Sequence, residues 1–123
     1  MADKKYTKEH EWVQVEDDTA IVGITNHAQE SLGDIVFVDL PTVGKHVKAK
    51  EDICVIESVK AASDIYSPID GEVIEINDNL SDDASIINQD SENTGWIFKI
   101  KISNLEQYNT LMSLDQYLAF LEK

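Results

Sequence analysis

The sequence predicts a mainly β protein, a flattened barrel or sandwich hybrid of short antiparallel strands with short C-terminal helices. Three observations favour this fold class. Short β-branched and aromatic runs recur along the chain, turn residues such as Ser67-Pro68 and Asp70-Gly71 separate them, and capping-box spacing marks the C-terminal region. The 123 residues are expected to form one domain, 1–123.

The N-terminal region is expected to begin with a β-hairpin and a short helix. Residues 12–16 and 19–24 have strand-like composition, and Asp17-Asp18 between them supplies a tight turn. A helix over residues 27–32 follows, with Thr25-Asn26 as its cap and a glycine just after its last residue.

Further strands are indicated by runs of β-branched and aromatic residues. These runs lie at residues 34–40, 53–57, 62–66, 72–76 and 96–102. In the last run, alternation places Phe98 and Ile100 on a core-facing side, with Ile97 and Lys99 on the other. The polar stretch 77–95 separates the last two strands.

The C-terminal segment 103–122 is expected to hold two short helices. Capping-box spacing starts at Ser103 and again at Ser113. Apolar side chains recur at helical spacing in both helices, and Leu114 and Leu118 belong to the second stripe. These stripes indicate packing surfaces rather than a cofactor pocket.

The charge balance excludes some classes of partner. The chain has 24 acidic residues against 10 basic ones, which are all lysines, and a formal net charge of −14. Such a surface is repelled by nucleic-acid phosphates and by anionic membranes. It favours a monomer that is steered toward partners with basic docking faces.

Cysteine use and hydropathy bear on the cell compartment. The single Cys54 lies in an apolar run, so it is expected to be a buried, inert thiol without an intramolecular disulfide. Nothing resembles a membrane span or a secretory signal. We expect a bacterial cytoplasmic protein, or a mitochondrial matrix protein if a transit peptide has been removed.

One lysine stands out by its position. Lys60 lies between two predicted strands, at the tip of the hairpin 53–66, where its side chain is directed into solvent. A free ε-amine is protonated in water, so acylation requires an enzyme that presents an activated acyl group and removes a proton. An exposed lysine at a hairpin tip can enter such a site.

The residues around this lysine carry a specific motif. It begins Glu57-Ser58-Val59-Lys60-Ala61 and continues to Val73, and it resembles the lipoyl-attachment hairpin of the glycine cleavage H-protein family. The resemblance extends over residues 10–12, 22–29, 32–41, 77–80 and 95–100. Biotin carriers typically flank their lysine with Met, and lipoyl domains of 2-oxo acid dehydrogenases tend to carry Asp before it; neither pattern occurs here.

The resemblance implies a carrier that is not an enzyme, with (R)-lipoate covalently attached to Lys60 and with neither catalytic residues nor a metal site. Its implied partners are a pyridoxal-phosphate glycine decarboxylase (P-protein), a folate-dependent aminomethyltransferase (T-protein) and dihydrolipoamide dehydrogenase (L-protein). The carrier would shuttle the aminomethyl group of glycine between them. A lipoate ligase or a lipoyl/octanoyl transferase would attach the lipoyl group.

The resemblance also implies roles for three acidic residues. By residue match, Glu11 and Asp64 are candidates for a cleft that protects the aminomethylated arm, and Glu57 is a candidate for recognition by the attaching enzyme. Each is equally an ordinary solvated acid in a strongly acidic chain. His10 and His27 have no zinc-ligand spacing and are interpreted as structural.

Two alternatives stay open, and one segment departs from the family. A lipoyl-relay protein would donate its lipoyl group to other lipoyl domains, and an unmodified interaction module would keep Lys60 as a free amine. Residues 90–95 lack the Pro-Tyr pair that commonly precedes the Gly-Trp step in the family. The shape of this loop is therefore not predicted by the resemblance.

Overall fold

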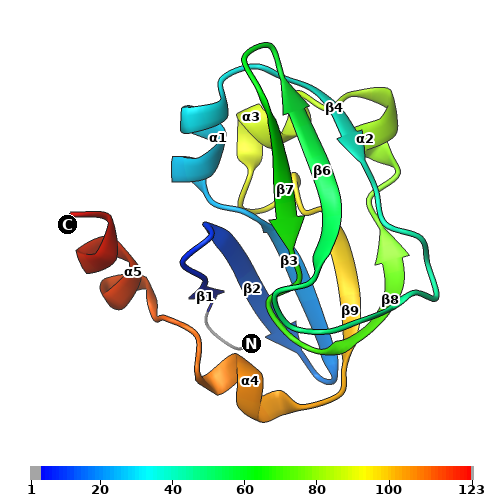
Figure 1. The fold of residues 1–123 in the computed structure, drawn as a ribbon, viewed down its shortest axis with the longest axis vertical. Coiled ribbons are helices and arrows are strands. Elements are labelled where there is room, and N and C mark those ends of the chain that lie inside the picture. The colour runs from blue at the N-terminus through cyan, green and yellow to red at the C-terminus, as the bar shows by residue number, and fades with distance from the viewer. Residues whose placement is uncertain (1–3, 123) are drawn as a thin grey trace.

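Two antiparallel sheets share one hydrophobic core in the computed structural model, which describes residues 4–122 (Figure 1). The larger sheet has six strands and the smaller has three, and together they form an open sandwich rather than a closed barrel. The predicted fold class is therefore confirmed.

The six-stranded sheet has the order β1-β2-β3-β9-β8-β5. Its strands are β1 (Lys5–Tyr6), β2 (Glu11–Glu16), β3 (Thr19–Ile24), β5 (His46–Val47), β8 (Gly71–Ile76) and β9 (Phe98–Ile102). The β2–β3 hairpin confirms the predicted one, with Glu16 paired to Thr19 across its turn. The two-residue strands β1 and β5 were not predicted, because they are too short to show alternation.

The three-stranded sheet carries the lysine. Its order is β4 (Ile35–Asp39), β6 (Asp52–Ser58), β7 (Ala62–Tyr66), so β4 and β7 lie on opposite sides of β6. The β6–β7 hairpin projects beyond the rest of the sandwich at the top of Figure 1. Its residues Ile56 and Ile65 are buried in the shared core and hold the hairpin against it.

The alternation expected for residues 96–102 holds only from Phe98 onward. Phe98 and Ile100 are fully buried, as predicted. Ile97 was expected on the outer side but is also fully buried, because it precedes β9, which begins at Phe98, and its N–H bonds to the Val22 carbonyl oxygen, 2.8 Å away.

Five helices flank the sheets within the described residues: α1 (Asn26–Leu32), α2 (Asn79–Asp82), α3 (Ile86–Asp90), α4 (Leu105–Asn109) and α5 (Leu114–Leu121). The predicted α1 is confirmed, with Thr25 accepting the Ala28 N–H as its N-cap. The structure adds α2 and α3 inside the polar stretch 77–95. Each is held by a single fully buried apolar residue, Leu80 or Ile87, which gives no helical period in the sequence.

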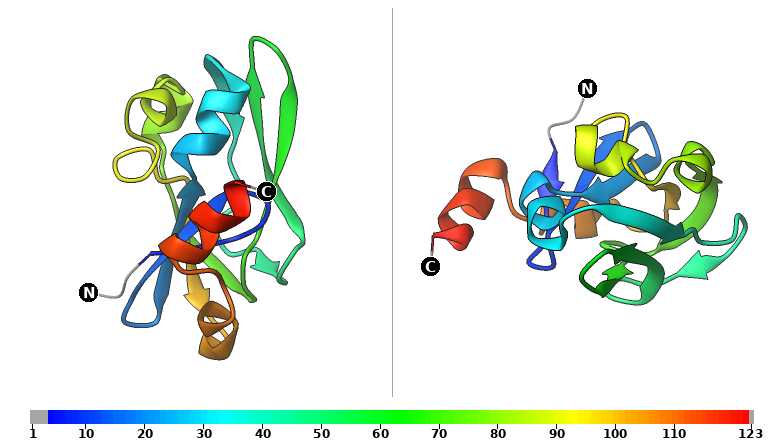
Figure 2. Two further views of the ribbon diagram at one scale, coloured as in Figure 1. Left: turned by 90° about the vertical axis from the view of Figure 1, so that its left-hand side faces the viewer. Right: turned by 90° about the horizontal axis from the view of Figure 1, so that it is seen from above.

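The two C-terminal helices are confirmed, with two corrections. Ser113 makes the capping box of α5, but α4 is capped by Asn104 rather than Ser103. The apolar stripe predicted for α5 is also wrong in part, because Leu114 and Leu118 are exposed. Figure 2 shows the reason: α5 lies at the side of the molecule, against the edge that holds β1.

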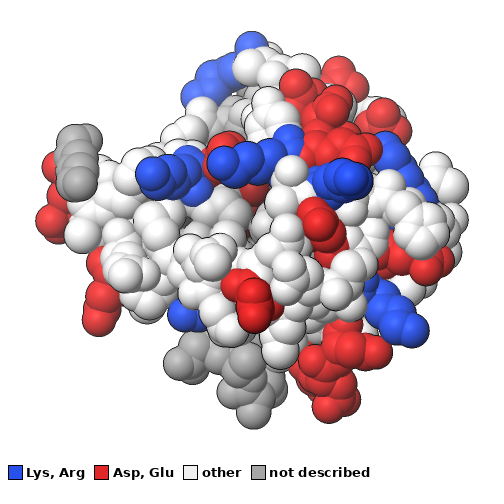
Figure 3. All heavy atoms as spheres, turned by 60° about the horizontal axis from the view of Figure 1, so that its bottom comes forward, with Lys and Arg blue, Asp and Glu red and all other residues white. Residues whose placement is uncertain are grey.

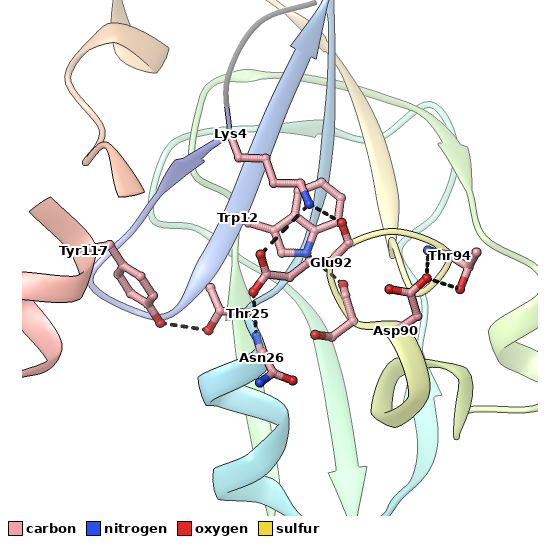
Figure 4. A network of polar contacts seen from close by, with 9 residues as sticks. Lys4, Trp12, Thr25, Asn26, Asp90, Glu92, Thr94 and Tyr117 are labelled. Carbon is pink, nitrogen blue, oxygen red and sulfur yellow. Dashed lines mark hydrogen bonds and ion pairs between the residues drawn. The ribbon is translucent and has the colours of Figure 1, made fainter. Parts of the chain in front are cut away.

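Helix α5 is attached mainly through Tyr117, with Phe120 and Leu121 packed beside the same aromatic cluster. Tyr117 is buried and stacks on Tyr6 with ring centroids 4.9 Å apart. Its hydroxyl lies 2.8 Å from both the Thr25 hydroxyl and His10 Nδ1, which ties α5 to the start of α1 (Figure 4). None of the helices within residues 4–122 is long and apolar enough to cross a membrane.

Candidate functional site

The turn that carries Lys60 is closed by its own backbone and by one serine. The Ser58 N–H donates to the Ala61 carbonyl oxygen at 2.8 Å. The Ser58 hydroxyl oxygen accepts from the N–H groups of Lys60 and Ala61, each at 3.1 Å. The turn is therefore well defined, while Lys60 itself is exposed.

The turn is also fixed to the segment that follows α1. The Val59 N–H donates to the Asp34 carbonyl oxygen at 3.0 Å. The Lys60 side chain passes over Gly33, where an added Cβ would lie 3.1 Å from the lysine Cε. Gly33 has φ +80°, a conformation that favours glycine. Glycine at this position therefore ends α1 and leaves room for the lysine.

A side chain from α3 holds this segment in place. Asn88 Nδ2 donates to the Gly33 carbonyl oxygen at 2.8 Å and to Gln29 Oε1 at 3.0 Å, and Asn88 Oδ1 accepts the Ile35 N–H at 2.8 Å. Asn88 therefore joins α1 and the start of β4 on either side of Asp34. A lone asparagine in a polar stretch gave no sequence signal for this role.

Two adjoining cavities lie along β7, between the lysine-bearing turn and the base of the hairpin. The outer one, about 280 Å³, is bounded by Leu32 of α1 and by Ser63 and Ile65 of β7. The inner one, about 200 Å³, is lined by Glu11 and Tyr66. Glu9 lines both cavities, so we describe them together as one feature, which we call the β7 groove.

The inner end of the β7 groove holds a buried carboxyl group. Glu11 is 1% exposed; one carboxylate oxygen accepts the Thr7 hydroxyl at 2.8 Å and the other accepts the Tyr66 N–H at 3.2 Å. Burial raises the pKa of Glu11 to about 7, although these two hydrogen bonds oppose the rise. Such a group is ready to ionise when a cation arrives.

The structure separates the other predicted acids from Glu11. Asp64 lies on β7 between Ser63 and Ile65, but it is exposed and faces the opposite side of the strand from these groove residues. Glu57 is exposed on β6, opposite Ala62 and close to the turn.

The two histidines lie together at the outer cavity. Their ring centroids are 4.8 Å apart, and His10 Nδ1 bonds to the Tyr117 hydroxyl. Burial lowers the pKa of His10, and the neighbouring His27 lowers it further. His10 thus serves the attachment of α5.

The segment 90–95, where the sequence departs from the family's usual pattern, holds the start of α1. Glu92 accepts the Asn26 N–H at 2.9 Å and pairs with Lys4, while the Ser91 carbonyl oxygen accepts from Trp12 Nε1 at 2.9 Å (Figure 4). These contacts join the loop to the wall of the β7 groove that α1 supplies.

The family model described as Glycine cleavage H-protein matches residues 4–123. The chain belongs to this family. Glycine cleavage H proteins from Thermotoga maritima and Escherichia coli are 52% and 55% identical to it, over 98% of this chain and 97% and 95% of theirs. The crystal structure of the glycine cleavage H protein from Mycobacterium marinum superimposes with a TM-score of 0.90 at 33% identity, covering 100% of this chain and 99% of that one.

Membership of the glycine cleavage H-protein family settles the kind of function. Proteins of this family are carriers of covalently bound lipoate and are not catalysts, so this chain is a lipoyl carrier of the glycine cleavage system. It works with the other components of that system.

Replacing Asn88 with alanine tests whether this side chain holds the lysine-bearing turn in place. We expect Asn88→Ala to lower the free energy of unfolding by about 1–3 kcal/mol, because it removes the partners of half-buried backbone groups. The Val59 amide should also exchange its hydrogen faster, as measured by hydrogen–deuterium exchange. Asn109→Ala, an exposed position on α4, is the matched control. Unchanged Val59 exchange would show that Asn88 does not hold the turn.

The burial of Glu11 predicts a pH dependence of stability. Between the ordinary pKa of 4.5 and the raised pKa of about 7, the folded protein keeps a proton that the unfolded chain has released. The contribution of Glu11 to stability is therefore full below pH 4.5 and is lost as the pH rises through 7. Glu11→Gln, which mimics the protonated acid, should gain about 3 kcal/mol over wild type across this range.

Urea denaturation between pH 4 and pH 8 measures the difference in the free energy of unfolding between Glu11→Gln and wild type. Glu16→Gln, at the exposed end of the same strand, is the matched control. A constant difference between Glu11→Gln and wild type across the range would contradict the raised pKa of Glu11.

Proposed function

We propose that Lys60 bears the lipoyl group and that the β7 groove receives the loaded arm, so that this chain passes the aminomethyl group of glycine from a pyridoxal-phosphate decarboxylase to a folate-dependent aminomethyltransferase. Dihydrolipoamide dehydrogenase then restores the carrier. The observation that carries the proposal is the arrangement of the site: the exposed Lys60 lies over Gly33, next to Leu32 in the wall of the groove, and the inner end of the groove holds the buried carboxyl group of Glu11.

The residues present fit a lysine-linked lipoyl group. Within residues 4–122, the Lys60 ammonium group has no hydrogen-bond or ion-pair partner, and Gly33 leaves room beside its aliphatic chain. Leu32 and Ile65 give the groove apolar walls for a hydrocarbon arm. When bound, the lipoyl group supplies a dithiolane that can take up and release the aminomethyl cargo.

Glu11 provides the charge that the cargo needs. An aminomethyl nitrogen is a cation at neutral pH, and a cation beside a buried carboxyl group favours the ionised form of that group. Glu11 would therefore lose its proton as the cargo arrives and form an ion pair that is stronger than one in water. Its hydrogen bonds from Thr7 and Tyr66 hold the carboxylate ready for this contact.

The charge of the chain supports docking with several basic partners. The net charge is −14, yet the face shown in Figure 3 carries lysine side chains among the acidic ones. The long-range attraction is therefore attributed to the net charge of the chain and not to this face, which is mixed in charge. Its curated relatives described above are bacterial, which supports a place in the bacterial cytoplasm.

Mass spectrometry of the chain tests the attachment site. After incubation with lipoate, ATP and a lipoate ligase, we expect one lipoyl increment on the peptide that contains Lys60. The increment should be absent from Lys60→Ala and present in Lys48→Ala, another exposed lysine. An unmodified wild-type chain in the presence of an active ligase would favour the unmodified interaction module.

The function of Glu11 separates glycine cleavage from lipoyl relay. We expect lipoylated Glu11→Gln to lose its aminomethyl cargo by hydrolysis at least about tenfold faster than wild type, because a charge-assisted hydrogen bond is lost. The release of formaldehyde measures this loss. Lipoyl donation to a second lipoyl domain should be unchanged in this variant; if cargo retention is unchanged as well, the relay function gains support.

A further inference from the structure

Three large apolar side chains lie exposed beside Lys60. Val36 and Phe37 on β4 are 59% and 51% exposed, and Val59, which precedes the lysine, is 67% exposed. We call these three residues the β4 patch. Exposed apolar groups that gather at one place often mark an interaction surface.

The exposure of two consecutive residues has a structural cause. Strand β4 pairs with β6 at Ile35 and again at Phe37, but the register shifts between these positions, so Val36 is an extra residue in the ladder. This bulge breaks the alternation of the strand. Ile35 and Val38 are buried and supply the core contacts, so the core does not require Val36 or Phe37.

The patch adjoins the lysine-bearing turn through the backbone. Phe37 pairs with Glu57 across the β4–β6 ladder, and the Val59 N–H bonds to the carbonyl oxygen of Asp34, just before β4. The side chains of Asp34, Asp39 and Glu57 are exposed around the apolar residues. The surface therefore has an apolar centre and an acidic rim, which complements an apolar surface with a basic rim.

We infer that the β4 patch is the docking surface for the enzyme that acylates Lys60, an inference that rests on the proposed attachment site. That enzyme must bring an activated acyl group, an acyl adenylate or a thioester, within bonding distance of Lys60 Nζ. An amide bond then forms from Nζ to the acyl carbon, the nucleotide or thiol leaves with the bonding electrons, and the enzyme accepts the amine proton. Its surface must therefore cover the neighbourhood of the turn.

The position of the groove distinguishes this enzyme from the other partners. The β7 groove and the β4 patch lie on opposite sides of β6, because β4 and β7 flank that strand. The other partners react at the far end of the arm. When the arm is stored in the groove, that end lies on the β7 side, so these partners must approach the β7 side. The enzyme that acylates the unmodified lysine acts before the arm is attached, so it must recognise the protein surface beside the lysine.

Lipoylation kinetics of the unmodified chain test this inference. The variants are Val36→Thr and Phe37→Thr, which keep strand-forming residues, and Val59→Thr, which lies outside the sheet. Ile74→Thr, an exposed apolar position on β8, is the matched control. With lipoate, ATP and a lipoate ligase, we expect each patch variant to raise the KM for the chain about tenfold, with kcat within twofold of wild type, and the control to match wild type.

Two results would overturn the inference. One is an unchanged KM in all three folded patch variants when wild type is lipoylated normally. The other is an unchanged lipoylation KM together with a raised KM for the oxidation of the dihydrolipoyl form of the variants by dihydrolipoamide dehydrogenase, which would assign the patch to a different partner. Failure of wild type to be modified on Lys60 would instead reject the attachment site, so the two failures are distinguishable.

Discussion

The hydrogen bond from the Val59 N–H to the Asp34 carbonyl oxygen fixes the lysine-bearing turn to the rest of the protein. A hairpin that projects from its sheet has few contacts of its own, and its tip would otherwise be free to move. Asn88 keeps the Asp34 carbonyl group in position for this bond, because it holds the backbone on both sides of Asp34. The Lys60 amine is then mobile on its own side chain while the backbone that carries it keeps a constant position, which suits the attachment site proposed for it.

The same segment that supports the turn also shapes the path of the arm. Gly33 ends α1 and turns the chain toward β4. Because it has no side chain, the Lys60 side chain can pass over it beside the end of the helix. Leu32, one residue earlier, faces the outer cavity, and Glu11 lies at the inner end. The groove thus offers apolar side chains such as Leu32 and Ile65 in its outer part and a buried carboxyl group at its inner end. An arm with a hydrocarbon body and a cationic end matches that order, and an arm without cargo lacks the charge that would hold its end in place.

Much of this could be predicted from the sequence, and the failures have physical causes. The hairpin bearing Lys60 and helix α1 were predicted because alternation, caps and turn residues are local signals. Helix α3 was not, because one buried residue, Ile87, holds it to the core and makes no period. Gly33 was expected only as the residue that ends α1; its contact with Lys60, like the contacts of Asn88, joins segments far apart in the chain, which single-sequence patterns do not record. Glu11 was named by family resemblance; only the fold shows that it is buried beside Tyr66.

The two sides of the lysine-bearing hairpin have different chemistry, and under the two proposals above this difference separates the lipoylation of the carrier from its use. On the β7 side a recessed groove leads to a carboxyl group that changes charge near neutral pH. On the β4 side a bulge turns Val36 and Phe37 outward at no cost to the core, which Ile35 and Val38 already fill. A flat apolar surface suits rigid docking of protein on protein, whereas a groove suits a flexible chain. An arm stored on one side leaves the other side exposed, so the hairpin can be recognised both before and after it is loaded.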